Sequence, residues 1–215
     1  MNLEKIPNFF PHALYMAAIT GYFLLIVLAP YLESTGSPLA PVVYEFFASQ
    51  CHQLTSRSLC IYPQSLAVSD CLPQDRTLAF TKQNEVTSAS LGPGFKLAMC
   101  ARDTGIFFGM IVGGLAAPFV VGLTGRKWPS KWLLAAAVVP IAIDGTVQLL
   151  GFKESTNTER LATGLVIGVV MPLYIIPIMN QIWWSLTEGR KARASAKDAR
   201  HGHSPRRKAL AEKKQ

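Results

Sequence analysis

Charged residues are scarce in this chain of 215 residues, because Asp, Glu, Lys and Arg make up only 16% of it. A soluble domain carries roughly 25%. Charges are missing altogether from residues 12–32, 104–125 and 161–184, and residues 132–150 hold one acid, Asp144. A helix of about 20 residues crosses a hydrocarbon core about 30 Å thick. Four such stretches leave too little polar chain to cover them with anything but lipid, so we predict an all-α integral membrane protein with four transmembrane helices.

The first stretch has one competing interpretation, a cleaved secretory signal. The apolar region of a signal is usually about 7 to 15 residues long, and residues 12–32 form a longer run that follows a barely basic segment. We therefore expect a retained helix and a membrane domain spanning residues 1–184.

Basic charge is concentrated at one end of the chain. Of the net charge of +8, residues 185–215 carry most, with ten Lys or Arg against three Asp or Glu. Basic segments beside membrane helices stay in the cytoplasm. We expect a disordered cytoplasmic tail that contacts anionic headgroups and does not bind nucleic acid. Four spans then place both termini in the cytoplasm of a multi-pass cell-membrane protein, with the loop 33–103 outside.

Three short stretches stand out: Cys51-His52-Gln53 with Arg57-Ser58, Cys100-Ala-Arg102-Asp103-Thr-Gly105, and Pro140 through Asp144-Gly145 to Gln148, followed by Asn157, Arg160 and Thr163-Gly164. At these residues the chain resembles a family of small prokaryotic membrane proteins whose domain is catalogued as being of unknown function. The resemblance implies a membrane location and a shared site, but no established reaction. Where that family usually has a second Cys after Cys-Ala-Arg, this chain has Asp103.

The predicted topology brings these pieces to one membrane face. Cys51, His52 and Arg57 lie in the outer loop, and Cys100, Arg102 and Asp103 lie where the second span begins. Asp144 and Gln148 are four residues apart and share a helix face, and Arg160 begins the fourth span. An acid inside a span costs about 2.5 to 3.5 kcal/mol on insertion scales, so Asp144 needs a partner or a cavity. We expect one polar pocket.

The cysteines allow several interpretations. Cys51, His52, Cys100 and Asp103 could hold zinc or another divalent metal, since thiolate, imidazole and carboxylate are all zinc ligands. Alternatively, all four Cys form two disulfides, as an oxidising exterior permits. A redox-active pair of Cys51 and Cys100 is the third option. We favour a local Cys60–Cys71 disulfide, with Cys51 and Cys100 in the site.

The function predicted from these residues is that of a metal-containing membrane enzyme acting on a lipid or other interfacial substrate. Arg57, Arg102 and Arg160 would bind an anion, and Asp144 would act as acid/base or as a partner of the metal site. A non-catalytic membrane scaffold or complex subunit is the alternative, and a thiol-disulfide redox protein a weaker one. The sequence contains no glycine-rich phosphate loop, G-x-S-x-G, H-E-x-x-H or C-x-x-C-H motif.

Glycines recur at intervals of four in the second predicted span, at Gly105, Gly109 and Gly113, and in the fourth, at Gly164 and Gly168. Small residues at this spacing let helix backbones approach closely in lipid. We expect the second and fourth spans to pack together within one chain, with a homodimer or larger membrane complex as the alternative.

The predicted topology can be tested with a membrane-impermeant thiol reagent. A cysteine introduced at Ser90 should react from outside intact cells, and one introduced at Gln215 only after the membrane is opened, against a background lacking Cys51 and Cys100. Labelling of both positions from the same side would contradict the topology.

Overall fold

The structure is a computed structural model that describes residues 9–71 and 82–200, with side chains as far as Glu188. Within these residues four helical segments are long and apolar enough to cross a membrane. They are α1 (Phe10–Ser34), α3 (Ala101–Val120), α4 (Lys131–Leu149) and the pair α5 (Asn157–Val170) and α6 (Pro172–Arg200). The four predicted spans each overlap one of these segments.

The fourth segment is broken where prolines predict a break. Helix α5 ends at Val170 and α6 begins at Pro172, which has no backbone N–H to continue the hydrogen-bond ladder. Helix α6 then extends beyond the bundle to Arg200. Residues 185–200, expected in a disordered tail, are thus helical, and residues 201–215 lie outside the described residues.

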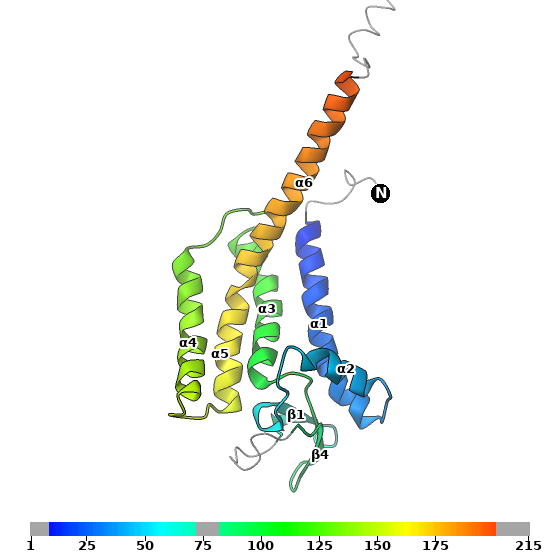
Figure 1. Ribbon diagram of the computed structural model, residues 1–215, viewed down its shortest axis with the longest axis vertical. Helices are drawn as coiled ribbons and strands as arrows, with labels where there is room; N and C mark the ends of the chain where they lie inside the picture. Colours follow the sequence, from blue (N-terminus) through cyan, green and yellow to red (C-terminus); the bar gives the residue numbers. More distant parts are fainter. Residues whose placement is uncertain (1–8, 72–81, 201–215) are drawn as a thin grey trace, which may run out of the picture.

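The helices alternate in direction and stand side by side (Figure 1). The connection from α1 to α3 and the short connection from α4 to α5 lie at one end, which we call the sheet end. The connection from α3 to α4, the start of α1 and the long extension of α6 lie toward the other end, which we call the opposite end. The loop 33–103, predicted to lie outside, is thus at the same end as the α4–α5 connection, which the predicted topology also places outside.

The all-α prediction needs a correction, because the α1–α3 connection contains a four-stranded antiparallel sheet. Its strands are β1 (Leu59–Tyr62), β2 (Ala67–Asp70), β3 (Glu85–Ser88) and β4 (Gly92–Lys96), in the order β2-β1-β4-β3. The sequence of residues 64–94, rich in Ser, Pro, Gln and Thr, predicts an irregular loop instead. The strands have only four or five residues each, too few to show alternation, and Gly and Pro within β4 argue against a strand.

A disulfide joins Cys60 on β1 to Cys71 just after β2, as the local pairing predicted. The two strands pair antiparallel, with Cys60 opposite Ser69. The disulfide therefore closes the end of a hairpin, and Cys51 and Cys100 remain free.

For the largely apolar residues 40–50 the sequence predicts a short helix at the membrane interface, with Val43, Phe46 and Phe47 toward lipid. Helix α2 (Ala40–Ala48) occupies this segment. The expected orientation was partly wrong. Phe47, predicted to face lipid with Val43 and Phe46, is fully buried against Ile26 and Ala98, whereas Phe46 is half exposed. Residues of α1 and of the segment before α3 cover this face of α2, so Phe47 completes a core instead of contacting lipid.

Helices α3 and α5 pack through their glycines. A Cβ at Gly109 would lie 2.7 Å from the backbone oxygen of Leu165 and 2.9 Å from the Cα of Gly168. Cβ atoms at Gly105, Gly113, Gly164 and Gly168 would also collide with backbone of the facing helix. The expected packing of the second span against the fourth within one chain is confirmed.

Because α3 and α5 are in backbone contact, adding one methyl group at a glycine of this contact should destabilise the protein, whereas adding one elsewhere should not. Gly109→Ala should lower the free energy of unfolding in detergent by about 1 to 3 kcal/mol, since two backbones must separate. Gly21→Ala in α1, where an added Cβ meets nothing within 4 Å, should be neutral or slightly stabilising, because alanine is the better helix former. Unfolding followed by tryptophan fluorescence measures both variants. Equal stability of the two would show that the close contact is not required.

Candidate metal and anion site at the sheet end

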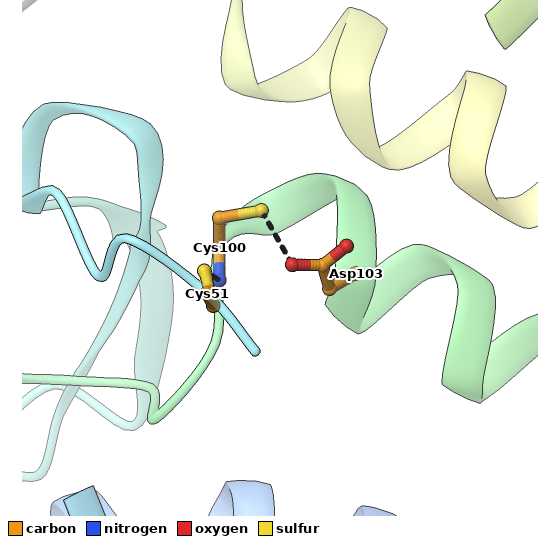
Figure 2. A group of neighbouring side chains, drawn as sticks. All are labelled: Cys51, Cys100 and Asp103. Carbon is orange, nitrogen blue, oxygen red and sulfur yellow. Dashed lines mark hydrogen bonds between the residues drawn. The ribbon is translucent and has the colours of Figure 1, made fainter. Parts of the chain in front are cut away.

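Three potential metal ligands converge where α3 begins (Figure 2). Cys51 lies in the segment after α2, Cys100 is the N-cap of α3, and Asp103 lies in the first turn of that helix. Their ligand atoms all lie within 4.8 Å of one another. The Sγ of Cys100 donates to Oδ2 of Asp103 at 3.1 Å, and the backbone N–H of Cys100 donates to Sγ of Cys51 at 3.4 Å.

The two thiols are electrostatically unequal. The neighbouring side chain of Cys100 lowers the pKa of the Cys51 thiol to about 7, and the backbone N–H groups of Gln53 and Cys100 act in the same direction. The interaction with Cys51 and burial together raise the pKa of Cys100. Of the pair, Cys51 is the residue that more readily becomes a thiolate, the form that binds metals and attacks disulfides.

Two residues without a role in the sequence-based prediction hold the Cys51 segment in place. Gln53 is buried with a φ of +53°, and its Nε2 donates to the backbone oxygens of Tyr44 at 2.7 Å and Ala98 at 3.0 Å. The Nζ of Lys96, a fully buried residue, donates to the backbone oxygen of Gln53 at 2.7 Å. Burial lowers the pKa of Lys96 to about 8. The only sequence signal for Lys96 was one cation among the apolar residues 91–100.

The three arginines predicted to belong to the site form a charged network beside the thiols. Arg102 pairs with Asp144 across α3 and α4. Arg57 and Arg160 both approach Oε1 of Glu154, at 3.5 and 3.6 Å.

Gln148 completes this network. With its amide oxygen turned toward the guanidinium groups, it accepts from Arg57 and Arg160 at 2.9 to 3.2 Å. Asp144 and Gln148 therefore both face arginines, as their spacing of four residues predicts.

One pocket of about 190 Å³ joins the thiols to the arginines. Seven of the eight predicted site residues line it: Cys51, His52, Arg57, Cys100, Arg102, Asp103 and Arg160. Asp144 is the exception, because it lines a neighbouring open pocket between α4 and α5, and its ion pair with Arg102 connects it to the site. His52 lines the pocket but is exposed and does not belong to the close group of ligand atoms.

Asn157 links this pocket to the sheet. It is fully buried, its Nδ2 donates to the backbone oxygen of Ser56 and to Asp70, both at 3.1 Å, and its Oδ1 accepts from Arg160 at 3.2 Å. The next residue toward the N-terminus, Thr156, caps α5 in a reciprocal capping box with Glu159. The motif contained Asn157, but nothing in the sequence showed which segment it would bind.

Four apolar helical segments and a polar site gathered at one end define a multi-pass membrane protein. The family model described as "Predicted membrane protein (DUF2085)" matches residues 87–174. An uncharacterised protein of Methanocaldococcus jannaschii is 32% identical over 167 residues, which cover 75% of this chain and 87% of that protein. The chain belongs to this family.

A second relative, an uncharacterised protein of Methanothermobacter thermautotrophicus, is 37% identical over 78 residues, or 35% of this chain and 67% of the relative. No solved structure matches the chain significantly.

The Arg102–Asp144 pair can be tested by a double-mutant cycle. Asp144→Asn should lower the free energy of unfolding by about 3 kcal/mol, because it leaves a guanidinium unpaired in a largely buried position. Arg102→Gln combined with Asp144→Asn should recover much of that loss, since both charges are then removed. Thermal unfolding of the single and double variants measures the coupling. Additive losses would show that the pair contributes nothing as a pair.

Proposed function

We propose that the sheet-end pocket is the active site of a membrane enzyme that binds zinc, or another divalent metal, through Cys51, Cys100 and Asp103. Its substrate is a lipid or another interfacial molecule with an anionic group, bound by Arg57, Arg102 and Arg160. The observation that carries this proposal is that three ligand atoms within 4.8 Å share one pocket with three guanidinium groups.

The donor set fits zinc in composition and number. Two thiolates and a carboxylate are accepted zinc ligands, and three protein ligands with a fourth position left open are typical of catalytic rather than structural zinc. His52 at the rim could supply a fourth ligand only by turning inward, because its side chain is exposed. A bound metal of this kind acidifies water or polarises an oxygen of the substrate.

The arginines suit an anion at the same place. A guanidinium group matches the oxygens of a carboxylate or phosphate with two parallel hydrogen bonds. The Nε atoms of Arg57 and Arg102 are buried and lack an acceptor among the described residues, so both guanidinium groups have donor capacity left over. Asp144 orients Arg102 in this arrangement, and its predicted role as acid/base remains a proposal.

Orientation completes the proposal. With the basic tail in the cytoplasm, the sheet end faces the outside and the substrate reaches the pocket from the outer leaflet. The disulfide between Cys60 and Cys71 supports this orientation, because disulfides persist in oxidising compartments.

Metal content of the purified protein tests the proposal. We expect about one zinc per chain in the wild type, and in Glu45→Gln, an exposed acid on α2 away from the pocket. Asp103→Asn should weaken zinc binding by at least the roughly 10- to 100-fold that losing an outer-sphere partner costs. Asp103→Cys introduces the cysteine that the sequence resemblance predicts at this position, and this variant should retain zinc. Absence of metal from the wild type after zinc-supplemented expression would favour the non-catalytic scaffold.

The geometry also favours a second candidate, a thiol-disulfide redox pair. Cys51 and Cys100 are free and adjacent, within the same 4.8 Å. Alkylation of unfolded protein should count two thiols in the metal-free wild type and none after mild oxidation. Failure of Cys51 and Cys100 to form a disulfide under oxidising conditions would remove this candidate without affecting the metal site.

A further inference from the structure

The opposite end of the bundle has a polar pocket that the proposed function does not use. Its volume is about 190 Å³, and it is lined by Thr124, Arg126, Asn180, Trp183 and Trp184. The guanidinium carbon of Arg126 lies 4.3 Å from the ring centre of Trp184, a cation–π contact. This pocket therefore combines one exposed cation with two tryptophan rings.

The loop that carries Arg126 is fixed to α6 by side-chain hydrogen bonds. Asn180 donates to the backbone oxygens of Leu123 at 3.2 Å and Gly125 at 2.9 Å, and Gln181 donates to the backbone oxygen of Arg126 at 2.8 Å. Asn180 is 5% exposed, and its Oδ1 is buried without a hydrogen-bond donor among the described residues. The pocket is thus built by specific contacts, and one of its lining residues has an acceptor without a donor among the described residues.

An apolar groove adjoins this pocket. It is lined by Phe10, Pro11, Leu14, Met179, Ile182, Trp183 and Leu186, from the start of α1 and from α6. Trp183 lines both the groove and the polar pocket, and its ring lies 5.0 Å from that of Phe10. A molecule with a polar head and an apolar chain could occupy the two together.

This end also has the residues of a membrane–water interface. All four tryptophans of the chain, Trp128, Trp132, Trp183 and Trp184, lie here, on α6 and at or before the start of α4. Tryptophan prefers the headgroup region of a bilayer. Arg126, Lys127 and Lys131 add three cations within six residues without an acid.

We propose that this end binds one phospholipid with an anionic glycerol-phosphate headgroup. Arg126 holds the phosphate, a headgroup hydroxyl supplies a donor for Oδ1 of Asn180, and an acyl or isoprenoid chain lies in the groove between α1 and α6. The site is separate from the thiols and arginines of the sheet end, so it goes beyond the proposed function.

Quenching of tryptophan fluorescence by lipids with brominated chains tests this proposal, because every tryptophan is at this end. In nanodiscs, Trp128→Phe combined with Trp132→Phe leaves Trp183 and Trp184 as reporters beside the site. We expect brominated phosphatidylglycerol to bind about fivefold more tightly than brominated phosphatidylcholine, the preference that one cation near a membrane surface can supply. Equal quenching by the two lipids would overturn the proposal.

Variants distinguish lipid binding in the pocket from a non-specific attraction of anionic lipid by the basic surface. Arg126→Gln should abolish the preference, whereas Lys127→Gln, which removes the adjacent exposed charge outside the pocket, should retain it. Arg126→Lys, which keeps the charge but not the paired donors, should give an intermediate preference and serves if Arg126→Gln fails to fold. Equal losses in Arg126→Gln and Lys127→Gln would mean that the surface attracts anions without a site.

A competition experiment distinguishes a lipid from a free anion. Inorganic phosphate and glycerol 3-phosphate, added at the concentration of the lipid, should not relieve quenching by brominated phosphatidylglycerol. Displacement by either one would show that the groove contributes nothing to binding, and would overturn the assignment of a lipid.

Discussion

The backbone contact between α3 and α5 is the constraint on which the rest of the structure depends. Without side chains at Gly105, Gly109, Gly164 and Gly168, the two helices approach until backbone meets backbone. The backbone oxygen of Arg102 lies 2.2 Å from where a Cβ of Gly164 would be, so the contact continues into the site itself. Cys100, Arg102 and Asp103 at the start of α3 and Arg160 at the start of α5 are therefore positioned by the same interface that holds the bundle. A change in the helix spacing would move the proposed metal ligands and the arginines of the pocket together.

Charge at the sheet end is placed at the edge of the apolar segments, where it can be paired. Each arginine of the pocket has an acidic or amide partner from a different element, such as Asp144 for Arg102 and Glu154 for Arg160. Pairing across elements lowers the cost of holding charges near a bilayer, and it also joins α3, α4 and α5 at one end. The same network leaves the Nε atoms of Arg57 and Arg102 without acceptors in the part of the chain that the structure describes. Stability alone would favour satisfying these donors, so their excess is an argument for a ligand.

The sequence predicted what depends on apolar length and on charge, and missed what depends on tertiary contacts. Uncharged runs identified the spans, glycine spacing identified the α3–α5 contact, and the shared end of the outer loops identified most of the pocket. The sheet was missed because its strands are short and interrupted by Gly and Pro. The prediction for Phe47 was wrong because the sequence pattern of α2 could not show that α1 and the segment before α3 pack against one of its faces. Lys96 was missed because a single cation in a loop gives no sign that a backbone oxygen, here that of Gln53, will accept from it.

The sequence resemblance predicts a cysteine at the position of Asp103, and the two residues would give the site different chemistry. A third thiolate at this position would make the ligand set softer and would allow several disulfide pairings among neighbouring cysteines. A carboxylate cannot form a disulfide, so in this chain the only pairing open to Cys100 within the group is with Cys51. Its oxygen also accepts from Sγ of Cys100, which favours the protonated form of that thiol until a metal displaces the proton. Asp103 thus supplies an anionic donor while restricting the redox chemistry, which is the combination expected of a residue that binds a metal in the proposed site.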